Sequence, residues 1–163
     1  MFQLRKFPGP VDRLIELARG SHKGVARAAM NALSHFSDPA VRELALETAQ
    51  KREWRRVALE MLIRNREPDD YRLLERLLEE QLDPDDYHDL GIGMRHFVTA
   101  HRSEDALRSL LLLYENEPCS LCRHGAVEEL IAINRLPQWA LEECRYDAYS
   151  ETRKLATAAS WIR

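Results

Sequence analysis

The sequence lacks the features that mark secreted, membrane or disordered proteins. Three cysteines in 163 residues cannot all pair within one chain, which argues against a disulfide-stapled secreted module. The longest apolar run, residues 110–114, is far shorter than the roughly 20 residues that a membrane span needs. Charged residues make up 31% and hydrophobic residues 45%, which argues against a disordered tail. No apolar segment of signal-peptide length follows the charged start, so we expect a cytoplasmic protein with no membrane segment.

A basic excess and catalytic motifs are also missing. Lys and Arg number 24 against 27 Asp and Glu, giving a formal charge of -3, whereas nucleic-acid binders are usually basic. There is no phosphate-binding Gly-rich loop, nucleophile elbow or His-Glu-x-x-His pair. Gly91-Ile-Gly93 lacks the third glycine of a dinucleotide loop. We therefore predict no catalytic residues and no nucleic-acid partner.

Helix formers dominate what is present. Leu and Ala supply about a quarter of the chain, and their apolar side chains recur at helical spacing. Start signals such as Ser37-Asp38-Pro39 and Asp83-Pro84-Asp85 separate the segments. Gly91 and Gly93 fall inside one predicted helix, where we expect a kink or a close helix contact. We predict an all-α fold of ten helices in five antiparallel hairpins, spanning residues 10–20 and 22–36, 38–51 and 53–65, 68–82 and 84–101, 103–116 and 119–134, and 137–144 and 149–162.

An arginine pattern repeats with the period of a helical hairpin. In each copy an Arg is followed, three residues later, by a small or apolar residue. Successive copies are separated by 29, 39, 28 and 30 residues, which is the length of two short helices and two turns. The arginines are Arg27, Arg56, Arg95, Arg123 and Arg153. We predict one repeat domain over residues 10–163, preceded by an extension at residues 1–9.

The segment DPAVRELALETA, residues 38–49, resembles the helix-opening signature of HEAT-like repeats. Residues 122–133 and 150–160 resemble weaker copies. The resemblance implies an α-solenoid with a right-handed superhelical twist, in which stacked hairpins bury each other's apolar faces. It also implies that a concave surface, or a ridge of turns, holds a partner protein.

The repeated arginines have two interpretations. The resemblance implies that such an Arg bonds turn carboxylates or carbonyls within the array. Alternatively, Arg27, Arg56, Arg95 and Arg123 line a groove that binds an acidic partner, since a guanidinium matches carboxylates bidentately. Trp139 and Tyr146 near the last hairpin are further contact candidates, because aromatic side chains bring large contact area. They could equally seal that hairpin, and Trp161 near the chain end has the same two interpretations.

The cysteines form the other candidate site. Cys119 and Cys122 have the spacing of a zinc half-site, and His124 and Cys144 could complete a Cys3His set. His124, two residues after Cys122, points about 200° around an ideal helix, which weakens this assignment. The alternatives are a Cys119–Cys122 redox pair and plain buried packing. His88 and His96, eight residues apart, are too far apart in sequence to chelate one metal as a pair.

Three function classes follow from these patterns. The leading hypothesis is a non-catalytic scaffold that binds a partner protein without a cofactor. The second is a zinc- or redox-responsive module built on Cys119, Cys122 and Cys144. The third, implied only by the resemblance, is a HEAT-type enzyme acting on nucleic acid or a tetrapyrrole.

Overall fold

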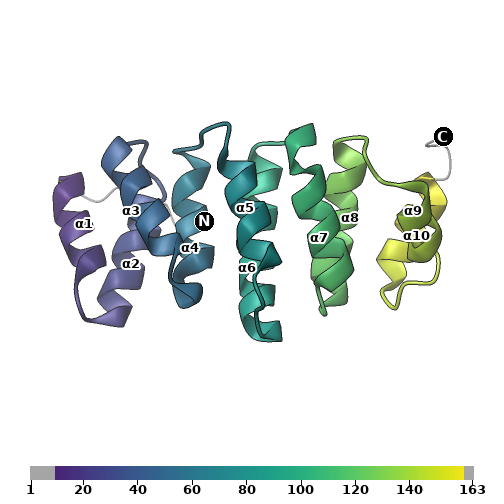
Figure 1. Cartoon of the computed structure of the whole chain (residues 1–163), viewed down its shortest axis with the longest axis horizontal. Coiled ribbons are helices and arrows are strands. Elements are labelled where there is room, and N and C mark those ends of the chain that lie inside the picture. The colour runs from purple at the N-terminus through teal and green to yellow at the C-terminus, as the bar shows by residue number, and fades with distance from the viewer. Residues whose placement is uncertain (1–9, 160–163) are drawn as a thin grey trace, which may run out of the picture. The chain divides into compact units, whose positions relative to one another are not determined.

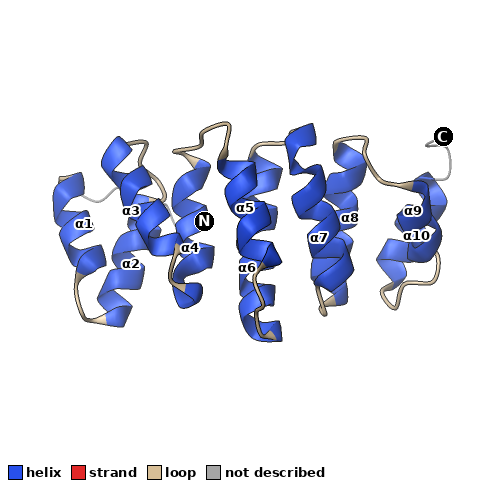
Figure 2. Ribbon diagram, in the orientation of Figure 1, coloured by secondary structure: helices blue, strands red, loops and turns tan. Residues whose placement is uncertain are grey.

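The computed structural model describes residues 10–159, and this part of the chain is entirely helical, as predicted (Figure 2). It contains ten α-helices and two short 3₁₀ helices, and no strand occurs between residues 10 and 159. No helix in this stretch combines the length and apolar character that a membrane span requires. The predicted extension at residues 1–9 and Trp161 lie outside the described residues.

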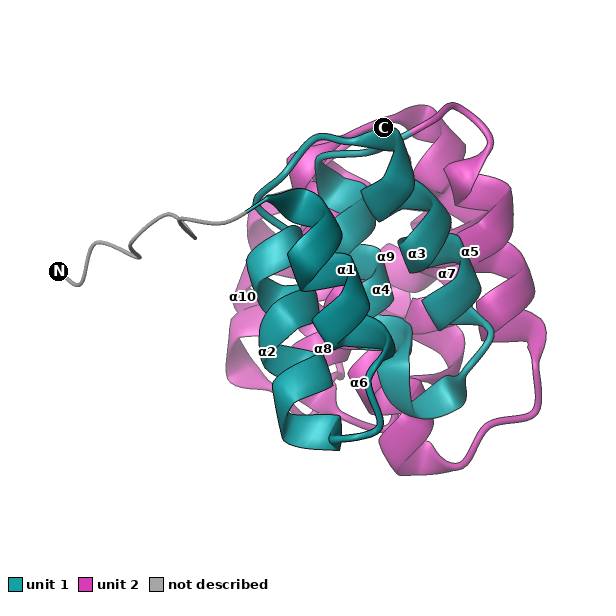
Figure 3. Cartoon of the chain, turned by 90° about the vertical axis from the view of Figure 1, so that its left-hand side faces the viewer, with its two compact units in different colours: residues 1–66 teal, residues 67–163 magenta. Residues whose placement is uncertain are grey.

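The chain folds into two compact units that meet in sequence between Arg66 and Glu67 (Figure 3). The first contains α1 (Val11–Arg19), α2 (Lys23–Leu33), α3 (Pro39–Ala49), η1 (Arg52–Trp54) and α4 (Arg55–Ile63). The second contains α5 (Asp70–Glu79), α6 (Pro84–Ala100), η2 (Glu104–Ala106), α7 (Leu107–Asn116), α8 (Ser120–Ala132), α9 (Gln138–Cys144) and α10 (Ser150–Ala158) (Figure 1). The helices begin and end within about four residues of the predicted spans.

Acidic residues cap the two helices whose start signals were clearest. The Asp38 carboxylate accepts the N–H of Ala40 at 2.8 Å, and Pro39 takes the first position of α3. At α6, the Asp83 carboxylate accepts the N–H groups of Asp85 and Asp86. A side-chain acceptor and a proline suit the first turn of a helix because its N–H groups have no partner within the helix.

In the first unit, consecutive helices pack against each other: α1 on α2, and α3 on α4, with α2 also contacting α4. Asn65 joins the end of α4 to the turn between α2 and α3. Its side-chain oxygen accepts the N–H of Asp38, and its amide donates to the carbonyls of Phe36 and Met61. The largest fully buried side chains here are those of Leu33, Leu44, Leu59, Met61 and Leu62.

In the second unit, helices of alternate number lie side by side: α5 with α7, α6 with α8, and α8 with α10. Pairs α7–α8 and α9–α10 also pack together. The buried Glu129 of α8 accepts hydrogen bonds from Thr99 and Arg102, at the end of α6 and just beyond it. This packing brings the first half of α6 close to the turn between α7 and α8.

Gly91 marks that close approach. It is buried in α6, which continues through both glycines without interruption. A Cβ atom on Gly91 would lie 2.7 Å from Leu113 Cδ1 and 2.8 Å from Glu117 Oε2, closer than real Cβ contacts. The expected close contact at this glycine is therefore confirmed, and its partner is the carboxylate that ends α7.

Candidate metal centre

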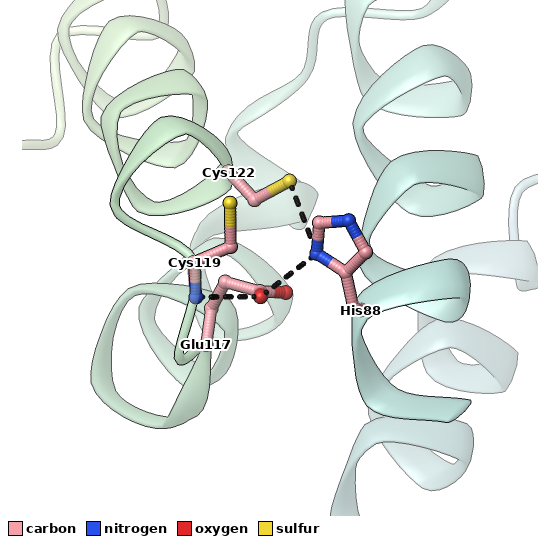
Figure 4. Close-up of side chains that lie close together, drawn as sticks. All are labelled: His88, Glu117, Cys119 and Cys122. Atoms are coloured by element: carbon pink, nitrogen blue, oxygen red, sulfur yellow. Dashed lines mark hydrogen bonds and ion pairs between the residues drawn. The ribbon is translucent and has the colours of Figure 1, made fainter. Parts of the chain in front are cut away.

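Four side chains that commonly bind metals converge where α8 begins. They are His88 on α6, Glu117 in the turn between α7 and α8, and Cys119 and Cys122 at the start of α8. Each offers one ligand atom, and these atoms all lie within 4.8 Å of one another (Figure 4). We call these four residues the ligand cluster; all of them belong to the second unit.

The Glu117 carboxylate accepts a hydrogen bond from the backbone of the turn that carries it. The Glu117 backbone is extended, with φ -73° and ψ 118°, and its N–H donates to the carbonyl of Leu113 at 3.0 Å. The side chain then turns forward, and its Oε1 accepts the N–H of Cys119 at 3.0 Å. The carboxylate is thus fixed at the residue that caps α8.

The two sulfurs share one side of α8 because of their spacing. Cys119 is the capping residue and Cys122 follows three positions later, nearly one helical turn. Figure 4 shows both sulfurs near the His88 ring. Cys119 is partly exposed and Cys122 is buried, so the cluster lies at the edge of the core.

One nitrogen of His88 faces two members of the cluster. Nδ1 lies 3.1 Å from Glu117 Oε1 and 3.6 Å from Cys122 Sγ, and the second ring nitrogen points away (Figure 4). A Cys-His-carboxylate relay needs both ring nitrogens, one toward the nucleophile and one toward the carboxylate. Convergence of both partners on Nδ1 therefore does not fit that relay, and it does fit ligands arranged around a single cation.

Glu117 is the most unusual member of the ligand cluster. Its side chain is 0% exposed, although carboxylates are seldom buried without compensation. Among the described residues, no donor forms a hydrogen bond with the buried Oε2. That oxygen lies 2.8 Å from the position that a Cβ atom on Gly91 would take, so it faces the backbone of α6. A bound cation would supply the missing compensation for this carboxylate.

The electrostatic surroundings disfavour a free thiolate at Cys122. Burial, followed by the neighbouring Glu117 carboxylate, raises the pKa of the Cys122 thiol to about 11. The Arg95 guanidinium opposes this shift and lowers the pKa. In the absence of a cation Cys122 is thus a protonated thiol near neutral pH, unlike an activated nucleophile.

The donor set and its spacing suit Zn²⁺. Two sulfurs, one imidazole nitrogen and one carboxylate oxygen are ligands that this ion takes in tetrahedral sites. Zinc bond lengths place such ligand atoms about 3.3 to 3.8 Å apart. The 3.1 Å and 3.6 Å separations from His88 Nδ1 lie close to this range. All separations within the cluster are at most 4.8 Å, and binding one ion would draw the wider ones inward.

The structure brings together only two of the four predicted ligands, Cys119 and Cys122. His124 lies elsewhere, with Nδ1 3.1 Å from Thr152 Oγ1 and its ring edge-on to Tyr149. Cys144 is buried on α9 and its thiol donates to the hydroxyl of Tyr114. The end of α9 does lie near the start of α8, since Arg123 pairs with Asp147 at 2.9 Å. Cys144, however, contacts Tyr114 of α7, whereas Cys119 and Cys122 gather at His88 of α6.

His88 and Glu117 were missed by the sequence analysis. His88 was considered only with His96 on its own helix, whereas its partners lie 29 and 34 residues later in the chain. That separation is close to the spacing of about 30 residues between most of the repeated arginines. A search for ligands one period apart, rather than on one helix, would have found His88.

The repeated arginines are placed in several different environments. Arg27 stacks over the Trp54 ring at 5.1 Å. Arg123 pairs with the buried Asp147 carboxylate at 2.9 Å, and Arg153 donates to the carbonyl of Asp147. The stem of Arg95 packs against Gly125, and Arg56 is exposed. Arg123 and Arg153 thus make the turn contacts that the structural interpretation expects.

The two aromatic candidates differ in exposure. Trp139 is 43% exposed and lies against Tyr114, with ring centroids 5.9 Å apart. Tyr146 is 88% exposed, so it does not seal the last helix pair. A groove of about 480 Å³ adjoins Trp139 and is lined by Tyr114, Glu115, Arg123, Trp139, Glu143 and Asp147.

Comparisons of the chain with protein-family models, with curated proteins and with solved structures find no match. Its function is therefore inferred from the ligand cluster and the surfaces around it.

Proposed function

We propose that this chain is a HEAT-like helical-repeat protein that binds one zinc-class divalent metal ion through His88, Glu117, Cys119 and Cys122. The observation that carries the proposal is the convergence of four ligand atoms within 4.8 Å around a fully buried carboxylate. Glu117 supplies the hard donor, His88 the borderline donor and the cysteines the soft donors, a combination suited to Zn²⁺ rather than Mg²⁺ or Ca²⁺.

The metal would serve a structural role. Four protein ligands fill a tetrahedral shell, which leaves no position for a reacting water or substrate. The ligands come from α6 on one side and from the α7–α8 turn with α8 on the other. A bound ion would therefore fasten α6 to α8, and its binding free energy would add to the stability of the second unit.

The test compares cluster residues with matched residues outside the cluster. The reduced 163-residue chain is titrated with Co²⁺, which reports tetrahedral sulfur ligation by its absorption bands, and zinc content is measured by mass spectrometry. We expect one metal ion per chain in the wild type, and its loss in His88→Ala and Cys122→Ser. The controls His124→Ala and Cys144→Ser should keep the metal.

Two results would overturn the proposal. One is a reduced wild type that binds no metal at micromolar Co²⁺ or Zn²⁺. The other is equal loss of metal in the two control variants. Circular dichroism of each variant separates loss of a ligand from loss of the fold.

The HEAT-like solenoid is supported by the side-by-side packing of alternate helices within each unit and by the capped Asp38-Pro39 start of α3. A single repeat domain would follow from that assignment. We further propose a cytoplasmic location, because a reducing compartment keeps the three free cysteines as thiols.

A second candidate function, docking of a partner protein without catalysis, is favoured by the exposure of Trp139 in the groove and by the exposure of Tyr146. Its test retains proteins from the native host's lysate on tagged variants. A stoichiometric partner should be lost from the Trp139→Ala, Tyr146→Ala variant while helicity is unchanged. If the partner is lost instead from the Arg56→Glu, Arg95→Glu double variant, these arginines belong to the docking surface. If both double variants retain the partner as the wild type does, neither set of residues forms the docking surface.

A further inference from the structure

We propose that peroxide oxidation joins Cys119 and Cys122 in a disulfide, and that this disulfide expels the metal ion from the ligand cluster. The inference rests on the proposed metal binding and adds its regulation: metal occupancy would depend on the thiol state. It uses only two members of the cluster, both at the start of α8.

The positions of the two cysteines favour the bond. Their sulfurs already lie within 4.8 Å of each other, and the residues are one helical turn apart. A disulfide needs a sulfur separation of about 2.05 Å and Cα atoms about 4.4 to 6.8 Å apart. Three helical residues rise about 4.5 Å along the axis and turn about 300° around it, which places their Cα atoms about 5 Å apart, within that range.

The two thiols differ in access in the way that such a reaction requires. Cys119 is partly exposed, so a small peroxide can reach its sulfur, whereas Cys122 is buried directly beside it. Cys144, the third cysteine, is 0% exposed and its thiol donates to the Tyr114 hydroxyl on a different part of the unit. Cys119 is therefore the expected site of first attack, and Cys122 is the expected resolving thiol.

The chemistry balances with hydrogen peroxide as the oxidant. The Cys119 sulfur attacks one peroxide oxygen and the O–O bond breaks, giving a sulfenic acid and one water. The Cys122 sulfur then attacks the Cys119 sulfur while its thiol proton passes to the leaving oxygen, so the S–O bond breaks and a second water leaves. The pair of sulfurs loses two electrons, which reduce the peroxide. The two protons come from the thiols in the metal-free protein and from solvent when the sulfurs are metal-bound thiolates.

Loss of both thiolates removes half of the ligand shell. Disulfide sulfurs are neutral and bind zinc poorly, since the thiolate is the metal ligand. Only His88 and Glu117 would remain, and two ligands do not hold a structural zinc ion. Reduction of the disulfide would restore the site.

The experiment exposes the zinc-loaded 163-residue chain to hydrogen peroxide and follows zinc release with a colorimetric chelator. We expect release of one equivalent of zinc together with the loss of two hydrogens from the tryptic peptide that contains both residues, residues 109–123. Dithiothreitol with added zinc should reverse both changes. Cys144→Ser should behave as the wild type.

Variants test the order of attack in metal-free protein, where no ligand shell is required. Cys122→Ser should accumulate a sulfenic acid at Cys119 that dimedone traps. Cys119→Ser should form no intramolecular disulfide. A trapped sulfenic acid at Cys144 only, or a disulfide to Cys144, would contradict the assignment of these two thiols.

Failure of this inference is distinct from failure of metal binding. A reduced chain that holds no zinc contradicts the proposed function. A chain that binds zinc, but keeps it after the disulfide has formed or forms no disulfide with peroxide, contradicts only the redox inference.

Discussion

At the scale of single residues, Glu117 has two roles that can be separated. Its Oε1 accepts a hydrogen bond from the N–H of Cys119 and faces Nδ1 of His88. Its Oε2 is buried with no hydrogen-bond donor among the described residues. A purely structural cap needs an acceptor oxygen but not a full negative charge. A metal ligand needs the charge as well, because the cation is its compensation.

Replacement of Glu117 by Gln distinguishes these roles. Gln keeps an oxygen for the Cys119 N–H and removes the buried charge. We expect the free energy of unfolding of the metal-free protein to stay within about 1 kcal/mol of the wild type or to rise. Zinc affinity should fall by about 100-fold or more, because one ligand is lost. Urea denaturation and zinc titration measure the two effects.

The matched control is Glu115→Gln, which removes an exposed carboxylate two residues earlier and should change neither quantity. A Glu117→Gln variant that unfolds more easily without metal, yet binds zinc as the wild type does, would make Glu117 a cap and remove it from the ligand shell.

At the scale of helices, Gly91 controls how closely α6 approaches the α7–α8 turn. Ala at this position would place a Cβ against Leu113 and the Glu117 carboxylate, both held in the packed interior. We expect Gly91→Ala to lower the free energy of unfolding by about 1 to 3 kcal/mol, the usual cost of overpacking. Zinc affinity should fall too, because the displaced carboxylate is a ligand.

Gly24 provides the control for helix propensity. It lies in α2, is exposed, and a Cβ there would be 3.4 Å from the nearest atom, on the His22 side chain. Gly24→Ala should be neutral or stabilise by up to about 1 kcal/mol. Thermal unfolding of both variants tests this contrast, and a stabilising Gly91→Ala would mean that α6 and the turn separate easily.

The helix starts, one close helix contact and half of the ligand cluster could be predicted from the sequence. Local signals sufficed for the helices: Asp38 and Asp83 cap their helices as expected, and Gly91 makes the expected close contact. Half of the ligand cluster was also local, since the spacing of Cys119 and Cys122 defines a half-site on one helical turn.

The other half of the ligand cluster, His88 and Glu117, could not be predicted from residues that are close in the sequence. Which residue faces Cys122 depends on how α6 rotates about its axis when it packs against α8, and side-chain packing decides that rotation. Motif reasoning therefore could not identify His88, and for the same reason it could not show that Cys144 contacts Tyr114 rather than the cluster. The repeat period is the one sequence feature that relates His88 to the cysteines.

At the scale of the whole chain, the division into two units makes the effect of metal binding local. Each unit has its own buried side chains, and all four cluster residues belong to the second unit. Proteins open locally as well as globally, so a ligand protects chiefly the segments that hold it.

Hydrogen exchange with and without zinc tests this locality. At a free zinc concentration of 100 times Kd, the ion adds about 2.7 kcal/mol to the stability of the segment that binds it. We therefore expect up to about 100-fold slower amide exchange in α6, α7 and α8, and unchanged exchange in α1 to α4. Cys122→Ser should show no slowing in either unit. Equal slowing in both units would mean that the chain unfolds as one cooperative block, and slowing confined to the first unit would place the metal outside the ligand cluster.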